Sequence, residues 1–137
     1  MIRQDPLTIT LRPHQERAVN AMWDNAKGQV IIPTGGGKTM CIFEDILSCM
    51  EMINKRHTFV IVAPRILLAE QLCSEFKEFT DRDIHILHVH SGETKHLSTT
   101  KVDDIKCHHA ICSIAGEHEI IFTTYHSLHK LEEAVLM

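Results

Sequence analysis

The chain of 137 residues is long enough for one domain, or for part of a larger one, with a hydrophobic core that needs no disulfide bonds or metal ions to stabilise it. Hydrophobic residues make up 44% of the sequence and charged residues 23%, which excludes a disordered or fibrous chain. The net charge of −4 excludes a strongly basic nucleic-acid tail, although it is compatible with a local positive groove.

The five cysteines are an odd number without the spacing of a disulfide framework. Residues 1–12 contain Arg, Gln, Asp and Pro where a signal peptide would be apolar. No run approaches the ~18 apolar residues needed to cross a bilayer. We therefore expect a soluble, cytoplasmic protein with reduced thiols and no membrane partner.

The first half of the chain alternates between helical and extended patterns. A helix is expected over residues 13–26, with a proline in its first turn. The β-branched run Val-Ile-Ile at 30–32 predicts a strand covered on both faces. A glycine-rich turn and then a helix over residues 38–53 are expected to follow it.

The next apolar run, residues 59–63, predicts the clearest buried strand, and Pro64 ends it. Leucine and phenylalanine then recur at helical spacing as far as residue 79. A third strand is expected at residues 84–89.

Residues 93–116 are polar, rich in histidine and hard to assign, whereas residues 119–123 predict a fourth strand and 127–136 a helix. Strands that alternate with helices predict an α/β fold, in which a parallel sheet is flanked by helices. Ligands of such sheets bind beyond the carboxyl ends of the strands.

The segment Ile-Pro-Thr-Gly-Gly-Gly-Lys-Thr at 32–39 lies between a predicted strand and a predicted helix. Its glycines let the backbone N–H groups curl around an anion, and the following helix adds its dipole. Lys38 is the expected catalytic residue, reaching the β- and γ-phosphates of a nucleotide, and the Thr39 hydroxyl is the expected ligand of Mg²⁺. The expected loop residues are Thr34, Gly35, Gly36, Gly37, Lys38 and Thr39.

This loop departs from the strict phosphate-loop pattern because Ile32 stands at the position of the first glycine. A turn residue is lost, but the anion-facing glycines, the lysine and the threonine remain. The alternative is a glycine-rich turn with an accidental lysine.

Three other segments accompany the loop: Leu-Arg-Pro-His-Gln at 11–15, the stretch 62–72 after the second strand, and 122–128 after the last. In this order the four motifs resemble the first RecA-like domain of superfamily 2 helicases and translocases, nearest to the restriction-enzyme, phage and DNA-repair branch. The resemblance covers roughly residues 11–131. It implies a P-loop NTPase fold, ATP and Mg²⁺ as cofactors, and ATP-driven movement on, or unwinding of, DNA in preference to RNA.

In similar proteins the arginine and glutamine of the upstream motif face the adenine, so the resemblance implies this role for Arg12 and Gln15. A glutamine amide has the donor and acceptor pair that can read the adenine edge. The alternative for Gln15 is an exposed position on a surface helix.

The resemblance also implies contacts with the nucleic-acid backbone, by Pro64, Arg65, Ser91, Gly92, Thr123 and Thr124. A cation and helix N-terminal amides beside a strand end suit a phosphate. The alternative for the Pro-Arg pair is an ordinary turn with a solvated arginine, and the alternative for the two threonines is a helix cap.

The family hydrolyses ATP through an Asp-Glu pair after a further buried strand, and this sequence has none. Glu44-Asp45 falls within a predicted helix, and no buried strand precedes Asp103-Asp104. We therefore expect residues 1–137 to be the N-terminal portion of a RecA-like domain. The second RecA-like domain, its expected partner, is absent from these residues, and we expect them to be inactive alone. Alternatives are a stand-alone nucleotide or nucleic-acid binding module, or another P-loop NTPase such as a small kinase.

Eleven histidines are unusual for this length. His88 and His90 are expected on one face of a strand with His85 opposite, and residues 107–109 with Cys112 form a local cluster of nitrogen and sulfur ligands. Because these spacings match no usual zinc finger, we expect surface histidines, buried thiols and no structural zinc.

Overall fold

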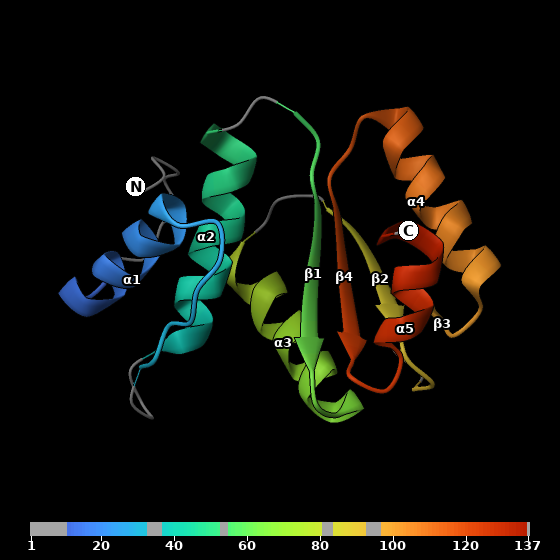
Figure 1. The fold of residues 1–137 in the computed structure, drawn as a ribbon, viewed down its shortest axis with the longest axis horizontal. Helices are drawn as coiled ribbons and strands as arrows, with labels where there is room; N and C mark the ends of the chain where they lie inside the picture. Colours follow the sequence, from blue (N-terminus) through green and yellow to red (C-terminus); the bar gives the residue numbers. More distant parts are fainter. Residues whose placement is uncertain (1–10, 33–36, 53–54, 81–83, 93–96, 137) are drawn as a thin grey trace. The chain divides into compact units, whose positions relative to one another are not determined.

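The computed structural model describes residues 11–32, 37–52, 55–80, 84–92 and 97–136. The chain divides into two compact units, residues 1–54 and 55–137 (Figure 1). Within the described ranges, no helix is both long enough and apolar enough to cross a membrane.

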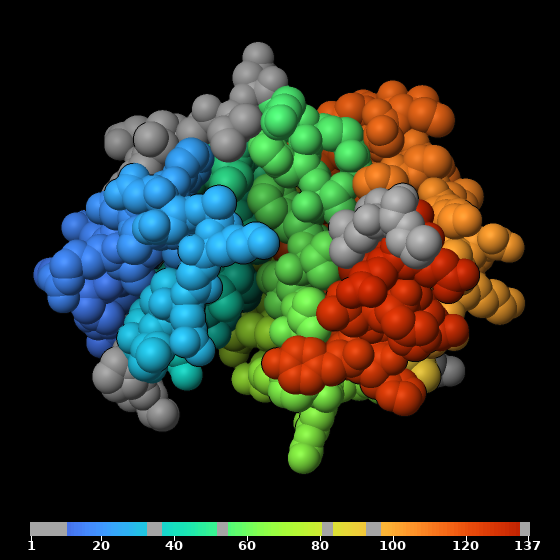
Figure 2. Space-filling view, viewed as in Figure 1, coloured from blue at the N-terminus to red at the C-terminus, as the bar shows by residue number. Residues whose placement is uncertain are grey.

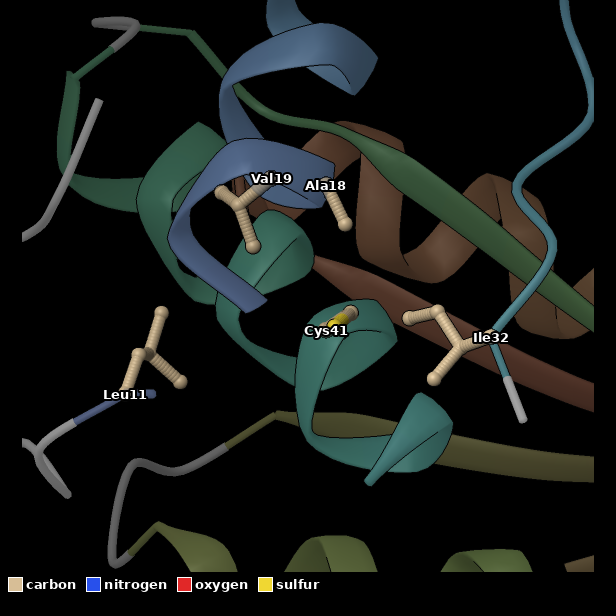
Figure 3. Close-up of a cluster of buried hydrophobic side chains, with 5 residues drawn as sticks. All are labelled: Leu11, Ala18, Val19, Ile32 and Cys41. Carbon is tan, nitrogen blue, oxygen red and sulfur yellow. The ribbon is translucent and has the colours of Figure 1, made fainter. Parts of the chain in front are cut away.

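The described part of the first unit contains the helices α1 (Pro13–Asp24) and α2 (Lys38–Met52), close to the predicted ranges. Proline occupies the first position of α1, where its missing N–H costs nothing because that group has no partner within a helix. One buried hydrophobic cluster of this unit joins both helices to the segments beside them (Figure 3) and consists of Leu11, Ala18, Val19, Ile32 and Cys41. Trp23 packs against this core from its edge.

The prediction of a doubly covered strand at residues 30–32 is wrong. The structure has no strand there, and the side chains of Val30 and Ile31 are 43% and 84% exposed. Ile32 alone is buried, pointing toward Cys41 of α2 (Figure 3). A strand requires a neighbour that completes its backbone hydrogen bonds, and none of the described strands pairs with this run. An apolar run is therefore not sufficient to make a strand.

The second unit contains a four-stranded sheet whose neighbouring strands are all parallel, in the order β1-β4-β2-β3. Its elements in chain order are β1 (Thr58–Ala63), α3 (Ile66–Phe79), β2 (His85–Val89), β3 (Leu97–Thr99), α4 (Val102–Ala115), β4 (Glu119–Thr124), α5 (Leu128–Leu131) and the π-helix η1 (Glu132–Leu136). The predicted α/β class is confirmed, as are the strands at 59–63, 84–89 and 119–123.

The unassigned stretch 93–116 contains the short strand β3 and the helix α4. The predicted helix over 127–136 consists of the single turn α5 and the π-helix η1. Helix α4 ends at Gly116, whose φ of 69° favours glycine and whose N–H donates to the carbonyl of Ser113.

All six residues of β4 are buried, which fits a strand with a neighbour on each side. The apolar side chains packed beside it come from β2, α4 and α5. This core consists of Leu87, Val89, Ile105, Ile121 and Leu131.

The expectation of surface histidines is wrong for His88 and His90, which are each only 1% exposed. As expected, they lie together, with 3.1 Å between His88 Nδ1 and His90 Nε2, whereas His85 bonds to Glu117. The N–H of Gly92 donates to His90 Nδ1 over 3.1 Å, which places the proton of neutral His90 on Nε2 and makes His90 the donor to His88.

The expectation of buried thiols is confirmed for Cys41, Cys73 and Cys112, but Cys107 is exposed. Burial raises the pKa of the Cys73 thiol to about 11, so this thiol is protonated and unreactive at neutral pH.

Replacing Leu87 by alanine tests the core of the sheet. Leu87 is fully buried, so we expect Leu87→Ala to lower the free energy of unfolding by about 2–5 kcal/mol, through lost burial and a residual cavity. Urea denaturation followed by circular dichroism measures this change. Leu97→Ala is the matched control, because Leu97 is 56% exposed and its replacement should change stability by less than about 0.5 kcal/mol. Equal effects would contradict the assigned core.

The pair His88–His90 predicts a dependence of stability on pH. Burial lowers the pKa of His90 below 6.5, and Glu70 partly opposes the shift. As the pH falls below 6.5, His90 takes up a proton in the unfolded chain before it does so in the folded chain. The free energy of unfolding therefore decreases as the pH falls from 6.5 to the lower pKa of the folded state. We expect His90→Asn, whose amide oxygen can still accept from Gly92, to lose less stability than the wild type between pH 7.5 and 5.5. Equal losses of stability in the two proteins over this pH range would disprove this role of His90.

Candidate nucleotide and nucleic-acid sites

The described part of the candidate phosphate loop is the start of α2. The helix begins at Lys38, its first turn contains no acidic residue, and the Lys38 side chain is exposed. The first N–H groups of a helix have no partners within it and favour an anion. Thr39 follows, half-buried, in the same turn. Thr34, Gly35 and Gly36 lie outside the described residues.

Gly37 connects the loop to the upstream motif. Its φ of 78° favours glycine, and a β-carbon at this position would lie 2.2 Å from Gln15 Nε2 and 3.1 Å from Arg12 Nη2. Gln15 Nε2 instead donates to the Gly37 carbonyl over 3.2 Å, and the Cys41 thiol donates weakly to the same oxygen. Only glycine therefore allows this close approach.

The structure thus brings together two motifs that are 22 positions apart in the sequence. Gln15 is 4% exposed, and its Oε1 accepts the N–H of Arg12 over 2.8 Å. These bonds fix the amide of Gln15 between the start of α1 and Gly37. The alternative, an exposed glutamine on a surface helix, is therefore wrong. Whether Arg12 and Gln15 face an adenine stays a prediction.

Two carboxylates of this unit, Glu44 and Asp45, lie within α2. Glu44 is fully buried, and burial raises the pKa of Asp45. In the described part of the second unit, the four strands are followed by Pro-Arg, His-Ser, Thr-Lys and Tyr-His. No described strand therefore ends in the Asp-Glu pair that activates water in this class of hydrolase.

A pocket of about 470 Å³ is lined by Ala21, Met22, residues 25–30 and Asp45. It lies at the C-terminal end of α1, whereas Arg12 and Gln15 lie at the other end. The pocket therefore shares no residue with the candidate phosphate loop.

The carboxyl ends of β1, β4 and β2 lie at one edge of the sheet, since Ala63 pairs with Thr124 and Val89 with Thr123. We call residues 64–65, 90–92 and 123–127, at or just after the ends of these strands, the strand-end edge. The N–H of Tyr125 donates to the carbonyl of Ala63 over 3.1 Å, which connects two of the three segments. Figure 2 shows the turn after β1 and the start of α3, in light green, projecting from the surface.

Arg65 is the exposed N-cap residue of α3, with an extended backbone and a first turn free of acidic residues. The preceding Pro64 is exposed as well. A guanidinium beside unpaired helix amides is suited to a phosphate, as the resemblance implies. A solvated arginine on an ordinary turn has the same geometry, so this role stays a prediction.

The two threonines of the strand-end edge are buried. Thr123 donates its hydroxyl proton to the carbonyl of Val89 over 2.8 Å, which ties β4 to β2. Neither threonine is the N-cap of α5, which is Ser127. A contact of Thr123 or Thr124 with nucleic acid stays a prediction, and the Thr123 hydroxyl already has an internal role.

Ser91 is exposed at the end of β2, and Gly92 lies close to α3, where an added β-carbon would lie 2.6 Å from Ile66 Cγ2. Ser98 donates its hydroxyl to the Gly92 carbonyl over 2.6 Å, or to that of His90 over 3.2 Å. These contacts place the predicted Ser-Gly pair beside the start of α3.

Tyr125 was not predicted from the sequence as a site residue, yet it is 66% exposed at the strand-end edge. An exposed aromatic ring there offers a surface on which a base can stack. The signal in the sequence was its position directly after a buried strand.

The solved structures that share the fold of this chain include two restriction-modification enzymes. One is a nuclease-deletion mutant of the Type ISP restriction-modification enzyme LlaGI in complex with a DNA substrate mimic, with a TM-score of 0.80 and 22% identity, covering 92% of this chain and 14% of that one. The other is the ATP-dependent Type ISP restriction-modification enzyme LlaBIII bound to DNA, with a TM-score of 0.74 and 19% identity, covering 92% and 9%. The chain thus spans a small part of either enzyme. No curated protein matches it significantly.

The sequence profile of the family described as "Type III restriction enzyme, res subunit" (ResIII) matches residues 8–136. The match includes the upstream motif, the candidate phosphate loop and the strand-end edge. The chain therefore belongs to the ResIII family, and the resemblance to superfamily 2 helicases is confirmed.

Proposed function

We propose that the chain is the nucleotide-binding, N-terminal portion of a RecA-like motor domain that couples ATP hydrolysis to movement on DNA. One observation carries the proposal: α2 begins with Lys38 and Thr39, and Gly37, just before them, is bonded to the buried Gln15 of the upstream motif. The membership in the ResIII family supports the same function.

The residues around the start of α2 suit a nucleotide with Mg²⁺. Lys38 supplies a cation for the β- and γ-phosphates, and Thr39 supplies a hydroxyl ligand for the metal. The close approach at Gly37 keeps the backbone of this residue near the start of α1, where Arg12 and Gln15 are the candidates for contact with the base. When bound, Mg²⁺ would neutralise charge on the phosphates.

The strand-end edge is the proposed DNA-binding surface. Arg65 and the N-terminal amides of α3 lie there, beside Ser91, Gly92 and Tyr125. The two solved structures described above have DNA or a DNA substrate mimic bound, and one is named as ATP-dependent. Backbone contacts of this kind are independent of base sequence.

A second candidate is a nucleotide-binding or nucleic-acid-binding module that performs no catalysis. The missing Asp-Glu pair favours it for these 137 residues, since nothing in the described part can activate water for attack on the γ-phosphate. Both candidates predict ligand binding by this chain. Only the first predicts ATP hydrolysis by a longer protein that contains this segment and a second RecA-like domain.

The first test replaces the lysine of the loop. We expect Lys38→Ala to weaken binding of a fluorescent ATP analogue in the presence of Mg²⁺ by roughly 10–100-fold, because a charge-assisted hydrogen bond is lost. A fluorescence titration measures the dissociation constant. We also expect no ATP hydrolysis above background by the 137-residue chain.

Lys27→Ala is the matched control, since it removes one exposed cation from the same unit. Unchanged binding by Lys38→Ala, or equal losses in both variants, would remove the assignment of the phosphate loop. Hydrolysis by the wild-type chain would disprove its proposed inactivity.

The second test addresses the strand-end edge. We expect Arg65→Ala to weaken binding of a single-stranded DNA oligonucleotide and to reduce the slope of log K against log salt by about 0.7, the value for one phosphate contact. Fluorescence anisotropy at several salt concentrations measures both quantities, and an RNA of the same sequence tests the preference for DNA.

Lys77→Ala is the control, because Lys77 is exposed in the last turn of the same helix, α3. It changes the net charge equally, and its salt slope should match that of the wild type. Equal slopes for all three proteins would disprove a phosphate contact at Arg65.

A further inference from the structure

Glu119, the first residue of β4, is fully buried among groups that each bind one of its two oxygens. Oε1 accepts from His109 Nδ1 at 2.8 Å and from the Thr58 hydroxyl at 3.3 Å, and Arg56 Nη2 lies 3.8 Å away. Oε2 faces a different partner, Nδ1 of His108, at hydrogen-bonding distance. One oxygen is thus held by the protein, and the other faces a potential metal ligand.

Cys112 completes this second group. It lies one helical turn after His108 on the same face of α4, with 3.9 Å between its Sγ and His108 Nδ1. One ligand atom each from His108, Cys112 and Glu119 lies within 4.8 Å of the other two. Ligand atoms on a tetrahedral Zn²⁺ lie about 3.3–3.7 Å apart, given bonds of ~2.0–2.3 Å, so small side-chain movements would suffice.

From this geometry we propose that His108, Cys112 and Glu119 bind a zinc-class divalent ion through Nδ1, Sγ and Oε2. Imidazole, thiolate and carboxylate are the three ligand types that Zn²⁺ takes in proteins, and a hard cation such as Mg²⁺ would not select the sulfur. His109 and Thr58 hold the other carboxylate oxygen, as outer partners commonly do for a ligating carboxylate. This proposal departs from our expectation that this chain has no structural zinc, and the experiment below decides between the two.

The surroundings of the three residues favour a cation there. The fully buried carboxylate of Glu119 supplies a negative charge to this group. A metal that binds here would displace the proton of the Cys112 thiol. His108 is 14% exposed, which leaves a path for the ion from solvent.

An ion-pair cluster without metal is the competing explanation, because two histidines and an arginine already surround one carboxylate. In that explanation Cys112 has no ligating role, so the thiol distinguishes the two. The site depends on neither ATP nor DNA, and its test is therefore independent of the proposed function.

The experiment uses the full 137-residue chain and two measurements. Elemental analysis after zinc loading and gel filtration should give one zinc per chain. Titration with Co²⁺ should give a thiolate-to-cobalt charge-transfer band, which Cys112→Ser abolishes while the circular dichroism spectrum is retained. His109→Ala should keep the band but weaken the affinity by roughly 10–100-fold, as loss of an outer partner does.

Cys107→Ser is the matched control, since Cys107 is an exposed cysteine on the same helix and is expected to change nothing. Substoichiometric zinc with no charge-transfer band would overturn the site. A band that persists in Cys112→Ser, or disappears in Cys107→Ser, would place the metal on other residues and overturn it equally. If Cys112→Ser is unfolded, His108→Gln, which leaves the thiol in place, should still lower the zinc affinity; unchanged affinity would overturn the site.

Discussion

The pairing of β4 on both sides is the constraint on which the second unit depends. Its six residues, all buried, form parallel ladders with β1 and with β2, so the three strands end at one edge. The hydroxyl of Thr123 reinforces one of these ladders by donating to the carbonyl of Val89. Because the ladders fix the register, the turns after the three strands lie beside one another. The strand-end edge therefore follows from backbone hydrogen bonding, before any side chain contributes.

Three strands of the sheet, β1, β2 and β4, could be predicted from the sequence because they are short apolar runs between turn residues, whereas β3 lies in the stretch that was left unassigned. The same reasoning failed at residues 30–32, where the run is equally apolar but has no described neighbour to pair with. Helix α4 was not predictable because its pattern is weakly amphipathic, with Ile111 and Ile114 exposed at 58% and 87%. Periodicity reports the burial of a segment, whereas strand formation also requires a pairing partner that local sequence does not specify.

The candidate sites were predictable to different degrees. The contact of Gln15 with Gly37 was not predicted, since the resemblance assigned Gln15 only to the adenine and nothing in the local sequence connects the two residues. The internal bond of Thr123 could not be foreseen, because a hydroxyl at a strand end can face solvent or a neighbouring carbonyl. Glu119 was missed as a ligand, since the Cys-His cluster was compared with linear spacings of zinc fingers, and the glutamate comes from a strand that follows the turn at Gly116.

The two ends of β4 have separate chemistries. Glu119 and Thr124 are five residues apart, which is about 16–17 Å along an extended strand. A metal ion at Glu119 therefore lies too far from the strand-end edge to touch a phosphate bound there. Its effect on that edge can pass only through the position of β4, because the ion would tie the start of this strand to α4. A metal bound there would hence act on the stability and register of the sheet, whereas binding at the opposite end would depend on Arg65 and the amides of α3.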